Sequence, residues 1–318
     1  MPNRSGVWDL ATQGVAINNG QWMDRIVCIE GGVSGYNQIL QFDISSGGTV
    51  RDFGTLTTAR LQSGGTCAGS ETRAVFAGGY NGSAMENVID FTTIFSGGNA
   101  TDFGDLTVAR AHNKASSNNT RMIISTGWTG AYIDTMDYIT IASTGNAIDF
   151  GNQSTTGMYQ GMLASPTRAV TGGGYTGGNR HNVIDYVTIA TTGNAADFGD
   201  LLAVVYGPGE CGSATRGVFT GGSTSAAATG QDVIQYITIA STGNATDFGN
   251  LTEGRYNVAG SGNRIRGISI GGYISTFTNT IDAITITTTG NAADWGDLTA
   301  AAHQCSATSN AHGGLTYG

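Results

Sequence analysis

Aspartates that recur at fixed spacing are the residues of this chain most able to do chemistry. One set opens the tripeptide Asp-Phe/Trp-Gly at positions 52, 102, 149, 197, 247 and 294, and a second lies twelve residues earlier at Asp90, Asp137, Asp185 and Asp282. Paired carboxylates could act as acid and base on a glycosidic bond. A residue that recurs at one offset more often repeats one structural task, such as accepting backbone N–H bonds or pairing with a recurrent arginine. We therefore interpret both sets as structural.

The candidate metal ligands are four cysteines and four histidines, His112, His181, His303 and His312. The sequence contains no His-Glu-x-x-His, His-x-x-x-His or Cys-x-x-Cys spacing. It also lacks a phosphate-binding Gly-x-x-x-x-Gly-Lys-Ser/Thr loop and a nucleophile elbow. We expect the histidines to make local hydrogen bonds, and we predict no metal, no cofactor and no enzymatic activity.

Composition excludes further classes of function. The 318 residues include 51 Gly, a single lysine at Lys114, and a net charge of -9, which argues against nucleic acid as a partner. No apolar run reaches the ~18 residues that span a bilayer, so we expect no membrane insertion. Residues 1–20 lack an apolar run of the signal-peptide type, so we expect synthesis in the cytoplasm without a signal peptide.

The elements that position these residues follow from a repeat. The six Asp-Phe/Trp-Gly tripeptides are separated by 50, 47, 48, 50 and 47 residues. Before each tripeptide lies a β-branched and aromatic run, such as residues 183–189, and several copies have a Thr-Gly-Asn turn between the two, at residues 144–146, 192–194 and 242–244. This pattern predicts two strands joined by a hairpin in which Gly and Asn take positive φ.

Two further strands precede each hairpin. One runs from an arginine to a glycine pair, as from Arg73 to Gly79, and the other is a run of small residues, such as 64–69, suited to a crowded position near an axis. Four short antiparallel strands per ~48 residues, with no helical periodicity, predict an all-β fold. We expect a six-bladed β-propeller of four-stranded antiparallel blades.

The sequence predicts different roles for the two ends of the chain. Residues 301–308 match the small-residue inner strand, including the sequence at 211–215, and we predict that this C-terminal strand completes the first blade and closes the ring. The propeller would then span residues 25–318. Residues 1–24, with Trp8 and Trp22 as candidate assembly-interface residues, would form a separate segment that either caps a blade or anchors the protein in an assembly.

The repeat resembles the kelch repeat in its order of motifs, as at residues 75–80, 88–91 and 102–104, over about nine-tenths of the chain. Kelch units usually carry Trp on the outer strand, where this chain has Phe five times and Trp295 once. Kelch-like copper oxidases need a histidine, tyrosine and cysteine context that this chain lacks.

The hairpin sequences are also similar to repeat-bearing structural proteins in the virions of tailed bacteriophages. This resemblance implies a virion component: a tail fibre, a tail appendage or a capsid decoration. It also implies that the N-terminal segment docks on other virion proteins.

A recognition surface is expected where an aromatic residue follows the glycine pair. Four repeats have one there, and these are the candidate ligand-binding residues: Tyr80, Trp128, Tyr175 and Tyr273. Aromatic rings at the start of variable loops could bind a host-surface glycan or protein, or they could pack between blades. A second column of arginines, at Arg60, Arg110 and Arg255, is expected to brace neighbouring blades.

The alternatives to a phage recognition protein come from two other classes. One is a carbohydrate-active propeller enzyme, and the other is a general kelch-type protein-interaction module.

Overall fold

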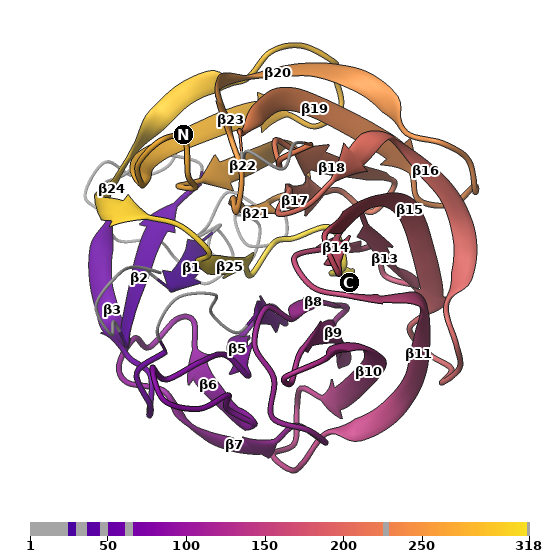
Figure 1. Cartoon of the computed structure of the whole chain (residues 1–318). Coiled ribbons are helices and arrows are strands. Elements are labelled where there is room, and N and C mark those ends of the chain that lie inside the picture. The colour runs from indigo at the N-terminus through magenta and orange to yellow at the C-terminus, as the bar shows by residue number, and fades with distance from the viewer. Residues whose placement is uncertain (1–24, 30–36, 45–49, 61–65, 225–228, 317–318) are drawn as a thin grey trace.

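Antiparallel strands make up the regular structure of this protein. The computed structural model describes residues 25–29, 37–44, 50–60, 66–224 and 229–316. Five four-stranded sheets and one five-stranded sheet surround a central axis (Figure 1). The predicted all-β propeller with four-stranded antiparallel blades is therefore confirmed. Within the described ranges, no helix has the length and apolar character needed to cross a bilayer.

Each sheet runs outward from the axis through an innermost, a second, a third and an outermost strand. The innermost strands are β4 (Thr66–Gly69), β8 (Lys114–Ser117), β12 (Gly161–Ala164), β17 (Gly209–Gly212), β21 (Ala259–Gly262) and β25 (Ser306–Ser309). The second strands are β1 (Arg25–Ile29), β5 (Arg73–Ala77), β9 (Arg121–Trp128), β13 (Arg168–Gly172), β18 (Arg216–Thr220) and β22 (Arg266–Ile270).

The third strands are β2 (Gln38–Asp43), β6 (Val88–Thr93), β10 (Tyr132–Thr140), β15 (Asn179–Thr188), β19 (Gln231–Thr238) and β23 (Thr278–Thr285). The outermost strands are β3 (Arg51–Thr55), β7 (Thr101–Asp105), β11 (Ile148–Gly157), β16 (Ala196–Val205), β20 (Thr246–Arg255) and β24 (Ala293–Ala302). Small residues occupy most innermost positions, as predicted, because these strands crowd together around the axis.

The expectation of six four-stranded blades was wrong, because among the described strands five sheets have four strands and the sixth has five. In the remaining sheet, the short strand β14 (Tyr175–Thr176) pairs with the beginning of β15 and adds a fifth strand. The physical reason is a hairpin at Gly177 and Gly178, both of which have positive φ. This turn folds the loop after β13 back along β15.

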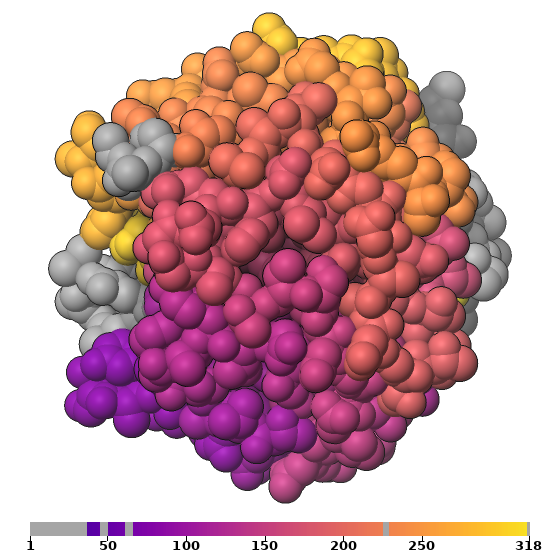
Figure 2. Space-filling view, turned by 45° about the vertical axis from the view of Figure 1, so that its right-hand side comes forward, coloured from indigo at the N-terminus to yellow at the C-terminus, as the bar shows by residue number. Residues whose placement is uncertain are grey.

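The ring closes through its two chain ends. β25 pairs antiparallel with β1, with Val27 opposite Thr308, so the predicted closure by a C-terminal strand is confirmed. The innermost strands contact one another in the cyclic order β4, β8, β12, β17, β21, β25. On the side where β11, β15 and β16 lie, the magenta to orange segments form one continuous surface (Figure 2). Closure in this way leaves no terminal sheet to associate with another chain.

Neighbouring sheets are joined by the two glycine-containing motifs. The Gly145 N–H donates to the Phe103 carbonyl of the preceding sheet at 2.8 Å, and the Asp105 N–H donates to Oδ1 of Asn146 at 3.1 Å. A Cβ on Gly104 would lie 2.5 Å from the Gly145 carbonyl, so this contact requires glycine. The same close approach recurs at Gly54 and Gly98, Gly151 and Gly193, Gly199 and Gly243, and Gly249 and Gly290. We call this arrangement the glycine junction.

The expectation that both Gly and Asn take positive φ in this turn was wrong for Asn. Gly145 has φ +154°, whereas Asn146 does not have a positive φ. Asparagine is used here for its side-chain oxygen, which accepts a backbone N–H from the preceding sheet. The turn is therefore as much a contact between sheets as a connection within one.

The arginine that opens the second strand also joins two sheets at β5, β9, β13, β18 and β22. The guanidinium of Arg121 lies 4.7 Å from the centre of the Tyr138 ring and donates to the Ile189 carbonyl of the next sheet at 3.0 Å. Arg266 stacks on Trp295 and donates to the Ile44 carbonyl, which ties the last sheet to the first. The same two contacts recur at Arg73, Arg168 and Arg216.

Buried ion pairs form a third set of contacts between sheets. The pairs are Arg60–Asp90 at 2.8 Å, Arg110–Asp137 at 2.8 Å and Arg255–Asp282 at 3.0 Å, each with both side chains excluded from solvent. Each arginine lies at or after the outermost strand of one sheet, and its aspartate lies in the third strand of the next. The predicted bracing role of Arg60, Arg110 and Arg255 is therefore confirmed.

The other junctions show how the fold replaces this ion pair. Val205 and Gln235 occupy the arginine and aspartate positions at one junction, and Ala302 and Leu40 occupy them at another. Both replacements remove the two charges together, which avoids leaving one charge buried alone. Asp185 is the exception, because Gly157 takes the arginine position. Ser154 donates to Asp185 instead, and burial raises the pKa of this carboxyl.

We predict that Arg110→Val destabilises the protein by about 3–5 kcal/mol, because it leaves the Asp137 carboxylate buried without a counter-charge, with only its hydrogen bonds from Thr107. The double variant Arg110→Val, Asp137→Gln copies the natural Val205 and Gln235 pair and should recover most of this loss. Urea unfolding of the wild type, both single variants and the double variant measures the coupling. A double variant no more stable than Arg110→Val would contradict the proposed compensation.

Candidate functional site

A ring of left-handed residues surrounds the axis where the innermost strands begin. Its described members lie ten residues after five of the tripeptide aspartates and are His112, Tyr159, Gly207, Asn257 and Gln304, all with φ between 54° and 65°. From Tyr159 onward, the N–H of each residue donates to the carbonyl of the preceding one, at 3.3, 2.8, 2.7 and 3.0 Å. Non-glycine residues in this conformation are strained, so the hydrogen bonds between sheets must hold them in place.

Side chains from this ring contact one another where the innermost strands begin, at the end of the space between these strands that we call the mouth of the central channel. The Gln304 amide donates to the Tyr159 hydroxyl at 3.1 Å, and the two residues are 145 positions apart in the sequence. The Tyr159 ring also lies 4.4 Å from the imidazole of His112. Burial raises the pKa of Tyr159 and lowers that of His112 to about 4, so both are uncharged at neutral pH.

Beside this mouth, aromatic side chains from successive sheets form a continuous chain of ring contacts. Tyr206 links Tyr175 to Tyr256, with centroid distances of 5.8 and 5.4 Å, and Tyr256 lies 5.3 Å from Tyr273. Phe277 continues the chain and stacks on His303 at 4.0 Å. These rings enclose a cavity of about 460 Å³, which we call the tyrosine pocket. It is lined by Met158, Tyr159, Tyr175, Arg180, Tyr206, Tyr256, Asn257, Tyr273, Phe277, His303 and Gln304.

The described lining of the tyrosine pocket contains one charged side chain and no carboxylate. The Arg180 guanidinium lies 5.3 Å from the centre of the Tyr206 ring and 5.8 Å from that of Tyr175. Burial lowers the pKa of His303 to about 4, and burial, with neighbouring tyrosines, raises that of Tyr256 to about 12. The pocket can therefore stack on a ligand and donate hydrogen bonds, but it lacks an acid–base pair of carboxyl groups.

The structure brings together some of the four predicted aromatic residues. Tyr175 and Tyr273 line the tyrosine pocket, and Trp128 reaches it through Tyr132, at ring distances of 4.7 and 6.1 Å. Tyr80 makes no ring contact with them within the described ranges, and its hydroxyl donates to the Gly82 carbonyl at 3.0 Å. The rings of Trp128, Tyr175 and Tyr273 are half-buried; Tyr175 and Tyr273 contact rings of adjacent sheets, whereas Trp128 contacts Tyr132 of its own sheet. Their ligand-binding role stays a prediction.

The candidate assembly residues Trp8 and Trp22 lie outside the described residues, as does the whole segment 1–24.

Sequence reasoning missed Tyr206 and Tyr256, and it considered His303 only as a metal ligand, although a signal for all three as pocket residues was present. All three lie nine residues after the Asp of a tripeptide, the position held by Ala111 and Met158 in other repeats. In the structure this position forms a bridge with the residue after the glycine pair, as between Tyr256 and Tyr273. The residue after the glycine pair and the residue nine positions after the tripeptide Asp therefore lie opposite each other. An aromatic residue at one of these positions predicts a contact with the residue at the other.

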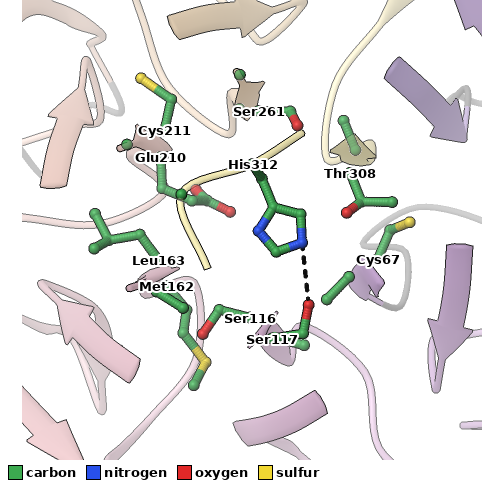
Figure 3. A pocket seen from close by; sticks show the side chains of 18 residues that line it. Cys67, Ser116, Ser117, Met162, Leu163, Glu210, Cys211, Ser261, Thr308 and His312 are labelled. Carbon is green, nitrogen blue, oxygen red and sulfur yellow. Dashed lines mark hydrogen bonds between the residues drawn. The ribbon is translucent and has the colours of Figure 1, made fainter. Parts of the chain in front are cut away.

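The opposite end of the channel is filled by the chain that follows β25. His312 donates from Nε2 to the Gly69 carbonyl at 3.0 Å and lies 3.3 Å from the Ser117 hydroxyl (Figure 3), while the Gly314 N–H donates to its Nδ1 at 3.2 Å. The cavity around His312 has a volume of about 50 Å³, which suits a water molecule rather than an organic ligand. The chain that follows β25 therefore plugs this end.

The channel interior holds an ion pair that joins two sheets separated by a third. Lys114 of β8 lies 3.0 Å from Glu210 of β17, and burial raises the pKa of Glu210 to about 6. Across the part of the chain that the structure describes, no three His, Cys, Asp or Glu side chains form a group able to hold a metal ion. The tyrosine pocket is thus the candidate site.

Comparison with known proteins adds no family: no protein-family model matches the chain, and no curated protein matches its sequence.

Acid should weaken the fold through His112, His303 and His312, whose pKa values burial lowers to about 4 from the ordinary 6.5. The unfolded chain takes up these protons first, so stability present above pH 6.5 is lost as the pH falls toward 4. We predict that His312→Gln makes this loss smaller. Urea unfolding at pH 7 and at pH 4.5 checks it, and an unchanged difference between the two pH values would contradict a neutral, buried His312.

Proposed function

We propose that this protein is a non-enzymatic recognition protein that binds a carbohydrate in its tyrosine pocket. The observation that carries this proposal is the pocket itself, with six aromatic side chains around a cavity of about 460 Å³. Ligand pockets in proteins commonly occupy ~300–1,000 Å³ and combine aromatic walls with a few polar groups. The walls supply flat rings for the apolar faces of sugars, and Asn257, Gln304 and Arg180 supply polar groups for hydroxyls.

The pocket is also pre-organised, which favours binding. Each ring contacts at least one other, and the glycine junctions hold the sheets that carry them. Arg180 packs against Tyr206, and Tyr159 is fixed by its hydrogen bond from Gln304. A ligand entering such a site immobilises few side chains, so less of its interaction energy is lost to ordering.

Two features support a binding role over catalysis. The described lining of the tyrosine pocket contains no Asp or Glu, the residues that glycosidases use in pairs. The recurrent aspartates Asp90, Asp137 and Asp282 are buried in ion pairs with arginine. Their conserved spacing within this chain is accounted for by the contacts between sheets.

We further propose that the protein belongs to a phage virion, as a tail fibre, tail appendage or capsid decoration. This placement follows from the resemblance of its hairpins to virion repeat proteins, and its kelch-like order of motifs fits a six-bladed ring in which the five-stranded sheet counts as one blade. Residues 1–24 would attach to other virion proteins, leaving the tyrosine pocket to meet a glycan of the host surface. Mass spectrometry of purified particles tests the placement.

A glycan array with the full-length protein tests the recognition function. We predict that Tyr206→Ala lowers the affinity for the bound glycan at least about tenfold, because it removes the ring that links Tyr175 and Tyr256. Tyr80→Ala is the matched control, since Tyr80 holds the same repeat position as Tyr175 but lies outside the pocket.

Equal binding by wild type and Tyr206→Ala, or retention of no glycan at all, would reject the tyrosine pocket as a carbohydrate site. Release of reducing sugar from any bound polysaccharide would overturn the non-enzymatic assignment.

A further inference from the structure

The charge of the tyrosine pocket differs in sign from that of the protein. The chain carries a net charge of -9, yet the only formally charged side chain in the described lining of the pocket is Arg180. The other lining residues are uncharged amides, aromatic rings and Met158, together with His303, whose pKa burial lowers to about 4. A ligand in this pocket would therefore meet one positive charge and no opposing carboxylate.

Arg180 is half-buried and lacks the carboxylate partner that the buried arginines have. Arg60, Arg110 and Arg255 each bind an aspartate within 3.0 Å. Arg180 makes one long hydrogen bond, from Nη1 to the Gly178 carbonyl at 3.4 Å, and its buried Nε has no partner in the described structure. The guanidinium is half-buried and has no carboxylate partner in the described structure, so its donors are available to an anionic acceptor.

The surroundings of Arg180 would strengthen such a contact. Its guanidinium packs against the faces of Tyr206 and Tyr175, which restrain its orientation and keep water from one side. Electrostatic attraction grows as the local dielectric constant falls, so an ion pair here gains more than one on an open surface. The planar donors of arginine also match the two oxygens of a carboxylate.

We propose that the tyrosine pocket selects an acidic sugar, whose ring stacks on the tyrosines while its carboxylate pairs with Arg180. This inference rests on the proposed function, because it names the class of glycan that the same pocket recognises. The aromatic walls provide affinity for the sugar ring, and Arg180 provides discrimination between an acidic sugar and its neutral counterpart.

Matched pairs of oligosaccharides test this selection by isothermal titration calorimetry. We would use trigalacturonic acid with its methyl ester, and sialyllactose with its sialic acid methyl ester, because each pair differs only in whether the carboxyl group is charged. Wild type should bind at least one acid about tenfold more tightly than its neutral partner. The preference should shrink as salt is raised.

Arg180→Met should abolish the preference while keeping the weaker binding of the neutral sugar. Arg180→Lys, which keeps the charge but loses the planar donors, should retain part of it. Arg264→Met is the control, since Arg264 is an exposed arginine in the turn between β21 and β22, at the opposite end of the strands from the pocket. Unchanged melting temperatures show that the variants fold.

The outcomes separate this inference from the proposed function. Equal binding of acid and neutral sugar that is still lost in Tyr206→Ala would overturn the role of Arg180 and leave carbohydrate recognition intact. An acid preference that survives in Arg180→Met would also overturn it, as would tighter binding of glucose 6-phosphate than of every carboxylate sugar. Binding of no saccharide would overturn both proposals.

Discussion

The close approach of two glycine backbones at the junctions between sheets is the constraint on which the ring depends. The Asp-Phe-Gly strand of one sheet and the Thr-Gly-Asn turn of the next meet so closely that a side chain on the first glycine would collide with the carbonyl of the second. Backbone hydrogen bonds and the asparagine side chain complete the contact. The outermost strand of one sheet is thus held against the glycine turn of the next sheet at a fixed separation.

The other contacts between sheets follow from that separation. An arginine can stack in its own sheet and still reach a carbonyl of the next, and Arg110 can reach Asp137 across the junction. Toward the axis, the strands come close enough that small residues are needed. The remaining space is filled by the Lys114–Glu210 pair and by the chain around His312. The tyrosine pocket lies at the other end, where Tyr206, Tyr256 and His303 replace a small residue such as Ala111.

Much of the fold could be predicted because its causes repeat along the sequence. The spacing of the tripeptides predicted the strands, the matching tail predicted the pairing of β25 with β1, and Arg60 predicted a brace. The side-chain role of Asn146 and the left-handed conformation of Tyr159 could not be predicted in this way, because they depend on contacts with another sheet.

The fifth strand β14 was missed because it arises from one loop and not from the repeat. For the same reason the sequence suggested Tyr175 and Tyr273 but did not show that Tyr206 and Arg180 share their pocket.

The glycine junction is tested most directly by comparing Gly199→Ala with Gly243→Ala in urea unfolding. Both glycines have unfavourable backbone angles for alanine, with φ of +144° and +153°. A Cβ at Gly199 would lie 2.6 Å from the Gly243 carbonyl, whereas a Cβ at Gly243 would meet nothing within 4 Å. We predict that Gly199→Ala costs more stability than Gly243→Ala by at least about 2 kcal/mol. Equal losses would contradict the claim that close backbone contact between sheets holds the ring together.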